Sequence, residues 1–161
     1  MRLTPGRLIS GSFDLWLPGG NAVGSQTRFF SPTADTTLTI PSTARSAITV
    51  GAYDPRLSSY ASFSGRGYTR ILHEIKPDLA APGVNIPAPR SGGGYASFTG
   101  ISFATPFVSG SAALMMEWGI LRGNDPFLYG EKLKAYLIAG AKPIASESEY
   151  PNRRVGWDDF V

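Results

Sequence analysis

The pattern of apolar and polar positions predicts short strands in the first 100 residues. Residues 1–30 alternate weakly, which is typical of one or two strands, and a turn signal at 18–21 closes them. Residues 36–40 are β-prone up to Pro41, and the apolar run 47–52 predicts a buried parallel strand. The remaining predictions are an alternating stretch at 57–63, a short strand within 75–83 and a Gly/Ser/Pro-rich loop at 84–100.

The pattern then changes to helical spacing. Small and apolar residues from Ser102 predict a helix ending near Gly119, and apolar residues on nearly all of its sides indicate burial. Asp125 as N-cap and Pro126 as the first helical residue predict an amphipathic second helix that ends at Gly140. Strands combined with two helices indicate an α/β fold. The weakly alternating start looks like the end of one unit joined to the middle of another.

Composition excludes several classes of function. The 161 residues are one domain's length, and the net charge of +3 comes from basic residues scattered along the chain. Scattered charge argues against a nucleic-acid-binding face. The absence of cysteine excludes disulfides, thiolate zinc sites and a cysteine nucleophile. No apolar run is long enough to span a membrane, and the first residues lack the apolar stretch of a signal peptide.

The candidate chemistry lies in residues 100–110, GISFATPFVSG. Ser102 stands between a glycine-rich loop and a helix, where backbone N–H groups and the helix dipole can stabilise a developing oxyanion. A serine in this place is also commonly an ordinary N-cap. Position alone therefore leaves a catalytic and a capping interpretation open.

The same segment resembles the nucleophile motif of the subtilisin-like serine proteases, or subtilases, Gly-Thr-Ser-x-Ala-x-Pro-x-x-Ser/Ala-Gly. The run 47–52 is similar to the central strand of that family, and residues 60–67 and 76–83 are similar to the segments that follow it. The resemblance covers residues 36–160. It implies the C-terminal half of a subtilisin-like, three-layer parallel-sheet domain.

The resemblance implies roles for individual residues. Ser102 would be the acylated nucleophile, with its own N–H in the oxyanion hole. Thr39 and Ile40 would line the primary specificity pocket, and Pro41 matches a position often cis in the family, although a plain strand-edge proline also fits it. Ile101 replaces the usual threonine, so we expect weaker or altered activity.

Other parts of the family's machinery do not occur in this sequence. The Asp-Ser/Thr-Gly, His-Gly-Thr-His and Gly-Asn-x-Gly segments, which would supply the catalytic Asp and His and the oxyanion Asn, are absent. The single histidine, His73, is expected on an exposed loop. Because serine needs a base to become a nucleophile at neutral pH, this chain alone should be inactive. The alternatives are a non-catalytic pseudoprotease remnant that binds peptides or a partner, and an unrelated α/β binding domain.

The N-terminal segments 13–18 and 27–32, together with 124–134, resemble a clostridial branch of subtilases related to spore-germination proteases. That branch carries an inserted jelly-roll domain, so residues 1–30 would be the end of the insert and 31–161 the C-terminal part of the catalytic domain. The implied partners are a protein or peptide substrate and the missing N-terminal half of the protease domain, with no nucleic acid and no membrane. No cofactor is expected. Calcium is common in the family, but no loop in this sequence matches well enough to name residues that would bind it. The resemblance favours a secreted or spore-associated protein.

Overall fold

The computed structural model describes residues 6, 13–18, 20–24 and 26–157, which fall into two compact units, Met1–Thr33 and Ala34–Val161. In the first unit the only described element is the short helix α1 (Gly20–Val23). Residues 13–18 form no strand among the described residues, contrary to the alternation. The predicted strand positions before residue 13 lie outside the described residues. The jelly-roll insert therefore stays a prediction.

The second unit contains a three-stranded sheet in the order β2-β1-β3. β1 (Val50–Asp54) runs parallel to β3 (Leu79–Pro82) and antiparallel to the short β2 (Ser59–Tyr60). The buried strand predicted at 47–52 is confirmed, although it begins only at residue 50. The strand between two prolines is confirmed as β3.

The β-prone segment 36–40 does not form a strand. The N–H groups of Thr36 and Thr37 donate to the carbonyls of Gly67 and Arg66, but Thr36 has a positive φ of 58°. That left-handed residue breaks the extended geometry a ladder requires. The segment instead lies as a loop beside residues 64–67.

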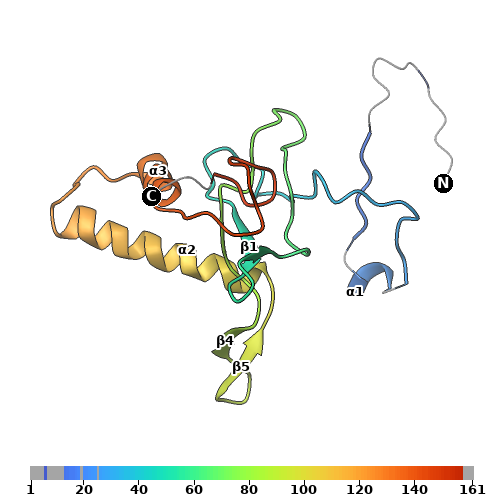
Figure 1. Cartoon of the computed structure of the whole chain (residues 1–161), viewed down its shortest axis with the longest axis horizontal. Coiled ribbons are helices and arrows are strands. Elements are labelled where there is room, and N and C mark those ends of the chain that lie inside the picture. Colours follow the sequence, from blue (N-terminus) through green and yellow to red (C-terminus); the bar gives the residue numbers. More distant parts are fainter. Residues whose placement is uncertain (1–5, 7–12, 19, 25, 158–161) are drawn as a thin grey trace. The chain divides into compact units, whose positions relative to one another are not determined.

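Residues 84–100, predicted as a loop, contain a β-hairpin. β4 (Ile86–Pro89) pairs antiparallel with β5 (Tyr95–Phe98), and Figure 1 shows this arm projecting from the sheet. The N–H of Arg90 donates to the carbonyl of Gly94, so residues 86, 88 and 90 face β5 while Pro87 and Pro89 turn their ring nitrogens outward. Prolines are tolerated at such edge positions. The prediction failed because the prolines and glycines were taken as loop signals.

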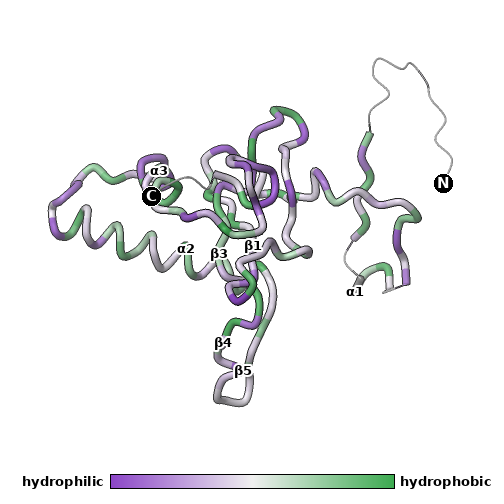
Figure 2. The backbone as a smooth tube through the Cα atoms, in the orientation of Figure 1, coloured by the Kyte–Doolittle hydropathy of each residue, from purple (hydrophilic) through white to green (hydrophobic). Residues whose placement is uncertain are grey.

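The long helix α2 (Ile101–Met116) continues into a π-helical turn, η1 (Glu117–Leu121), so Gly119 does not end it. Instead Gly119 packs closely against Leu128: a Cβ added to Gly119 would lie only 2.9 Å from the Leu128 side chain. Only Ala104 and Val108 of α2 are fully buried, and Leu114 is 68% exposed. The predicted burial is therefore wrong, although Figure 2 shows apolar residues recurring along the helix.

The last helix, α3 (Gly130–Ala139), begins four residues later than predicted and ends at Gly140 as expected. Asp125 does not cap it. Its backbone carbonyl closes a turn to Leu128, and its carboxylate lies 2.6 Å from Lys132 in the first turn of the helix. The Asp125 carboxylate therefore forms an ion pair with the first turn of α3, although Asp125 itself precedes the helix.

The core of this unit lies between α2 and the sheet. It is made of Ala52, Ala61, Leu79, Ala81, Ala104 and Val108, with α3 contributing partly buried Leu137 and Ile138. Small side chains dominate this list, so α2 lies close to β1 and β3.

Candidate active site

One backbone hydrogen bond ties the start of α2 to the residue after β3, and a second ties that residue to β1. The N–H of Gly100 donates to the carbonyl of Gly83, and the N–H of Gly83 donates to the carbonyl of Tyr53. A Cβ on Gly83 would come within 2.7 Å of the Ala52 side chain and 3.4 Å of the Ala104 side chain. Only glycine allows this approach, which fixes where the helix begins.

Ser102 is the second residue of α2, and Gly100 occupies the N-cap position with no side-chain cap bond. The capping interpretation of Ser102 is therefore wrong. Its side chain is exposed, and its hydroxyl forms no hydrogen bond within the described part of the chain. Phe103, the next residue, stacks on Phe98 with ring centroids 5.0 Å apart, which ties the hairpin to the helix start.

A hollow of about 460 Å³ is lined by both Thr39 and Ile101, the residue that precedes Ser102. Leu38, Val50 and Phe63 add apolar surface to it. The fold thus brings Thr39 to the element that carries Ser102, 63 positions apart in the chain. Ile40, by contrast, is 89% exposed and does not line the hollow.

The segment that carries Thr39 is fastened to β1 by a relay of hydroxyl groups. Ser42 Oγ donates to the carbonyl of Thr39, and Thr49 Oγ1 donates to the carbonyl of Ser42. Lys76 Nζ in turn donates to Thr49 Oγ1 at 3.3 Å. The Ile40–Pro41 peptide within this segment is cis.

The relay ends in a buried charge cluster formed by Lys76, Asp78 and Lys134. Lys76 Nζ lies 2.7 Å from Asp78 Oδ2, and Lys134 Nζ lies 2.7 Å from Asp78 Oδ1. Burial lowers the pKa of the Lys76 ammonium, while its hydrogen bond to Asp78 opposes that change. The N–H of Thr49 also donates to Asp78 at 2.7 Å, so the cluster holds β1, β3 and α3 together. Sequence reasoning missed these supporting residues, although Lys76-Pro77-Asp78 was visible as a segment.

His73 is exposed and lies on the loop before β3, as predicted. The backbone N–H of His73 donates to the carbonyl of Thr69, and the backbone φ of His73 is 50°. Within the described residues nothing links its imidazole to Ser102. The described chain therefore places no general base on the Ser102 hydroxyl.

The described residues contain no group of three or more His, Cys, Asp or Glu side chains arranged to hold a metal ion. In the same residues, no helix has the length and apolar character needed to cross a bilayer.

Residues 19–157 match the model of the subtilase family, peptidase S8. The chain belongs to the subtilase family. Both the family and the α/β fold predicted from the sequence are thereby confirmed. Subtilases are serine proteases, so the match also supports that activity at the level of the family.

Individual relatives agree with this assignment. The structure of the Clostridium perfringens CspB protease superposes with a TM-score of 0.77 and 48% identity over 84% of this chain. Serine protease AprX of Bacillus subtilis is 37% identical over 124 residues, or 65% of this chain. Subtilisin BL of Lederbergia lenta is 38% identical over 113 residues, or 70% of this chain. The similarity to a clostridial protease agrees with the branch that the sequence resembles.

These relatives are much longer than the present subtilase. It spans 28% of the CspB chain, 26% of AprX and 37% of subtilisin BL. Its three-stranded sheet and two long helices thus correspond to part of each relative.

Proposed function

We propose that this subtilase segment carries the nucleophile of a serine endopeptidase, with Ser102 attacking the peptide bond. The observation that supports it best is the exposed, unengaged hydroxyl of Ser102 on the first turn of α2. Ser102 stands within the family's motif and directly follows Ile101, which lines the same hollow as Thr39. Thr39 and Ile40 are proposed as substrate-binding residues, with Thr39 in the pocket wall and Ile40 on the surface.

In the proposed reaction, Ser102 Oγ bonds to the carbonyl carbon of the scissile peptide. A histidine base takes the hydroxyl proton and passes it to the leaving amine as the carbon–nitrogen bond breaks. Water then hydrolyses the acyl-enzyme ester and restores the hydroxyl. The N–H of Ser102, at the positive end of the α2 dipole, would stabilise the oxyanion.

The histidine, its aspartate partner and the asparagine of the oxyanion hole must come from residues outside this sequence. In subtilisin, removing a single member of the triad lowers kcat by roughly four to six orders of magnitude. We therefore propose that the chain is inactive alone and becomes active with a complementing segment of a subtilase domain. The family resemblance favours a secreted or spore-associated setting for its protein or peptide substrates.

The test uses a fluorophosphonate probe, which labels activated serine nucleophiles covalently. The full chain is incubated with the probe alone and after co-expression with a polypeptide that carries the Asp-Ser/Thr-Gly, His-Gly-Thr-His and Gly-Asn-x-Gly segments. We expect labelling only in the co-expressed complex, and mass spectrometry should place it on Ser102. The variant Ser102→Ala should lose it, while Ser109→Ala, seven residues along the same helix, should keep it.

Two outcomes would overturn parts of this proposal. Labelling of the chain alone, abolished by Ser102→Ala, would refute its inactivity in isolation. A stable complex that hydrolyses no peptide and takes no label would favour the second candidate function, a non-catalytic binding module. The exposed apolar side chains of α2 and η1, among them Leu114 and Leu121, are the observation that favours association in that case.

A further inference from the structure

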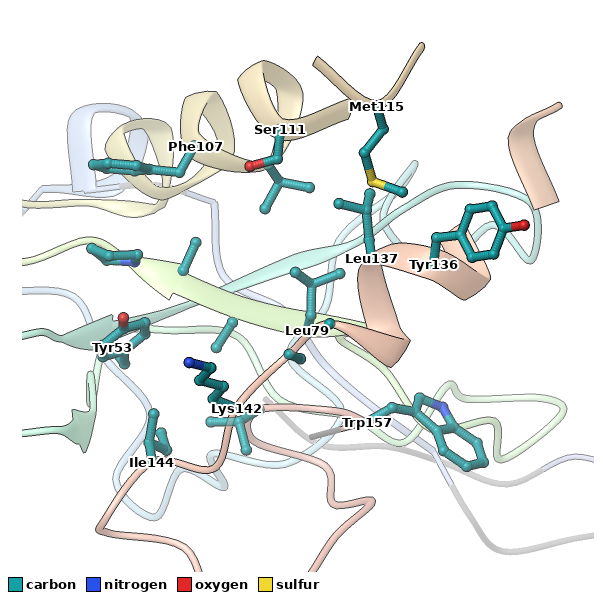
Figure 3. Close-up of a pocket in the computed structure, with 17 residues that line it drawn as sticks. Tyr53, Leu79, Phe107, Ser111, Met115, Tyr136, Leu137, Lys142, Ile144 and Trp157 are labelled. Carbon is teal, nitrogen blue, oxygen red and sulfur yellow. The ribbon is translucent and has the colours of Figure 1, made fainter. Parts of the chain in front are cut away.

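A second hollow, of about 340 Å³, follows the side of β3 that faces away from β1, where no further strand pairs with β3 among the described residues. Figure 3 shows Phe107, Ser111 and Met115 of α2 along one side of the strand, and Lys142 and Ile144 along the other. We call this hollow the β3-edge groove. It contains neither Ser102 nor Thr39, so it is separate from the candidate active site.

The backbone of β3 offers hydrogen bonds to this groove. The N–H groups of Leu79 and Gly83 donate to β1, to the carbonyls of Thr49 and Tyr53 respectively. Because successive backbone groups of a strand point to opposite sides, the N–H and C=O of Ala80 must point into the groove. Pro82 has no N–H to offer there, and the carbonyl of Asp78 is already occupied by the N–H of Trp157. An added strand would therefore be short and centred on residue 80.

The two walls of the groove differ in chemistry. The wall toward α2 and α3 is apolar, with Met115 and Leu137 prominent in Figure 3. The opposite wall carries Lys142, whose exposed ammonium has no ion pair in the described chain. An extended peptide presents its side chains alternately to two opposite sides. Its apolar residues would face α2, and the residues between them would face Lys142.

We propose that the β3-edge groove binds an extended segment of a partner polypeptide in which apolar and acidic residues alternate. The segment adds to the sheet through the outward N–H and C=O of Ala80, a mode in which main-chain bonds give affinity and side-chain pockets give specificity. The charge of Lys142 selects acidic over basic segments. This binding does not depend on the proposed peptidase activity, because no residue of the catalytic proposal takes part.

The test measures fluorescence anisotropy of a labelled peptide, Ser-Val-Glu-Val-Glu-Val-Ser, titrated with the full chain. A second peptide has lysine in place of both glutamates. We expect the acidic peptide to bind and Lys142→Glu to weaken its binding at least about fivefold while improving the basic peptide. The matched variant Arg28→Glu makes the same charge change on an exposed residue of the other unit and should leave both affinities unchanged.

The backbone contribution is tested separately with Ala80→Pro. This variant deletes the outward N–H and leaves the β1–β3 ladder intact, so we expect about fivefold weaker binding with an unchanged thermal midpoint, given that a hydrogen bond is worth about 1 kcal/mol. Should Ala80→Pro unfold, an acidic peptide N-methylated at alternate positions makes the same test on the wild-type chain. Two such peptides are made, one methylated at the odd-numbered and one at the even-numbered positions, and one of the two should fail to bind.

Four results would overturn the proposal. The first is an acidic peptide that shows no saturable binding at millimolar chain concentration, and the second is binding that Lys142→Glu leaves unchanged. Concentration-dependent self-association, abolished by Ser111→Trp in the groove wall, would assign the groove to a second copy of the chain. Binding that occurs only in a variant ending at Trp157 would assign it to residues 158–161.

Discussion

The Lys76 ammonium lies 2.7 Å from Asp78 Oδ2, and both side chains are only 3% exposed. Lys134 Nζ approaches the other oxygen of the same carboxylate, so the single negative charge of Asp78 pairs with two ammonium groups. The hydroxyls of Thr49 and Ser42 connect this cluster to Thr39. The position of Thr39 in the wall of the hollow therefore depends on the buried carboxylate of Asp78, which lies much later in the sequence.

Removing that carboxylate should destabilise the fold strongly. Asp78→Asn keeps the shape of the side chain but leaves the buried Lys76 ammonium and the partly buried Lys134 ammonium uncompensated, so we expect the unfolding free energy to fall by about 3–5 kcal/mol. Urea denaturation measures the change. The control is Glu117→Gln, which breaks the exposed 2.6 Å pair with Arg122 and should cost about 1 kcal/mol or less. Equal losses in the two variants would contradict a special role for the cluster.

The close approach of β3 to α2 makes Gly83 sensitive to a single added methyl group. In Gly83→Ala the new Cβ meets Ala52 at 2.7 Å, and we expect a loss of about 1–3 kcal/mol from overpacking. Gly110, in the middle of α2, has nothing within 4 Å of such a Cβ. Gly110→Ala should instead stabilise the helix, by up to about 1 kcal/mol, so the two alanines are expected to change the thermal midpoint in opposite directions.

The Asp125–Lys132 pair should give stability a defined pH window. The hydrogen bond from Lys132 lowers the pKa of Asp125, and the same bond raises the pKa of Lys132. The contribution of Asp125 is therefore present above its ordinary pKa of about 3.9 and lost as the pH falls through the lowered value. The contribution of Lys132 is present below about pH 10.4 and lost as the pH rises through its raised value.

Thermal unfolding of wild type and Lys132→Met measures this window. The variant should melt lower at neutral pH, and the difference should disappear at strongly acidic and strongly alkaline pH. Lys142→Met removes an exposed lysine that has no ion pair in the described chain. The difference in thermal midpoint between this variant and wild type should not vary with pH. A Lys132→Met difference that is constant from acid to alkali would refute the assignment.

The exposed apolar side chains on α2 and η1 should drive association. Leu114 is 68% exposed and Leu121 is 82% exposed. We expect the double variant Leu114→Gln, Leu121→Gln to sediment as a smaller species than wild type at the same micromolar concentration, with little change in its thermal midpoint. The matched variant Leu57→Gln alters a residue that is 70% exposed on the turn after β1 and should sediment like wild type.

The sequence predicted the parallel pair β1 and β3 well, because a buried strand is a contiguous apolar run. The helix α2 was also predicted, but its burial was not, since periodicity reports which positions are apolar and not which of them other residues cover. The hairpin was missed because Pro87 and Pro89 look like loop residues until their partner strand is known. Asp125 looked like a cap, but its carboxylate pairs with a lysine seven positions later.

The candidate site shows the same division. The motif around Ser102 is contiguous, so its place at a helix start could be predicted from local sequence. The proximity of Thr39, the outward position of Ile40 and the relay from Lys76 depend on contacts between residues distant in the chain. No local pattern encodes them. The family match supports the enzyme class, and the residue roles are open to the labelling experiment.

The two prolines of β4 limit how the hairpin arm can combine with other chains. With Pro87 and Pro89 turned outward, one side of the arm cannot extend a sheet, while the outer side of β5 keeps its N–H groups. Two arms could therefore join through their β5 strands into a four-stranded unit, and both ends of that unit would then be closed. Growth into a continuous ribbon is blocked by the sequence of the arm itself.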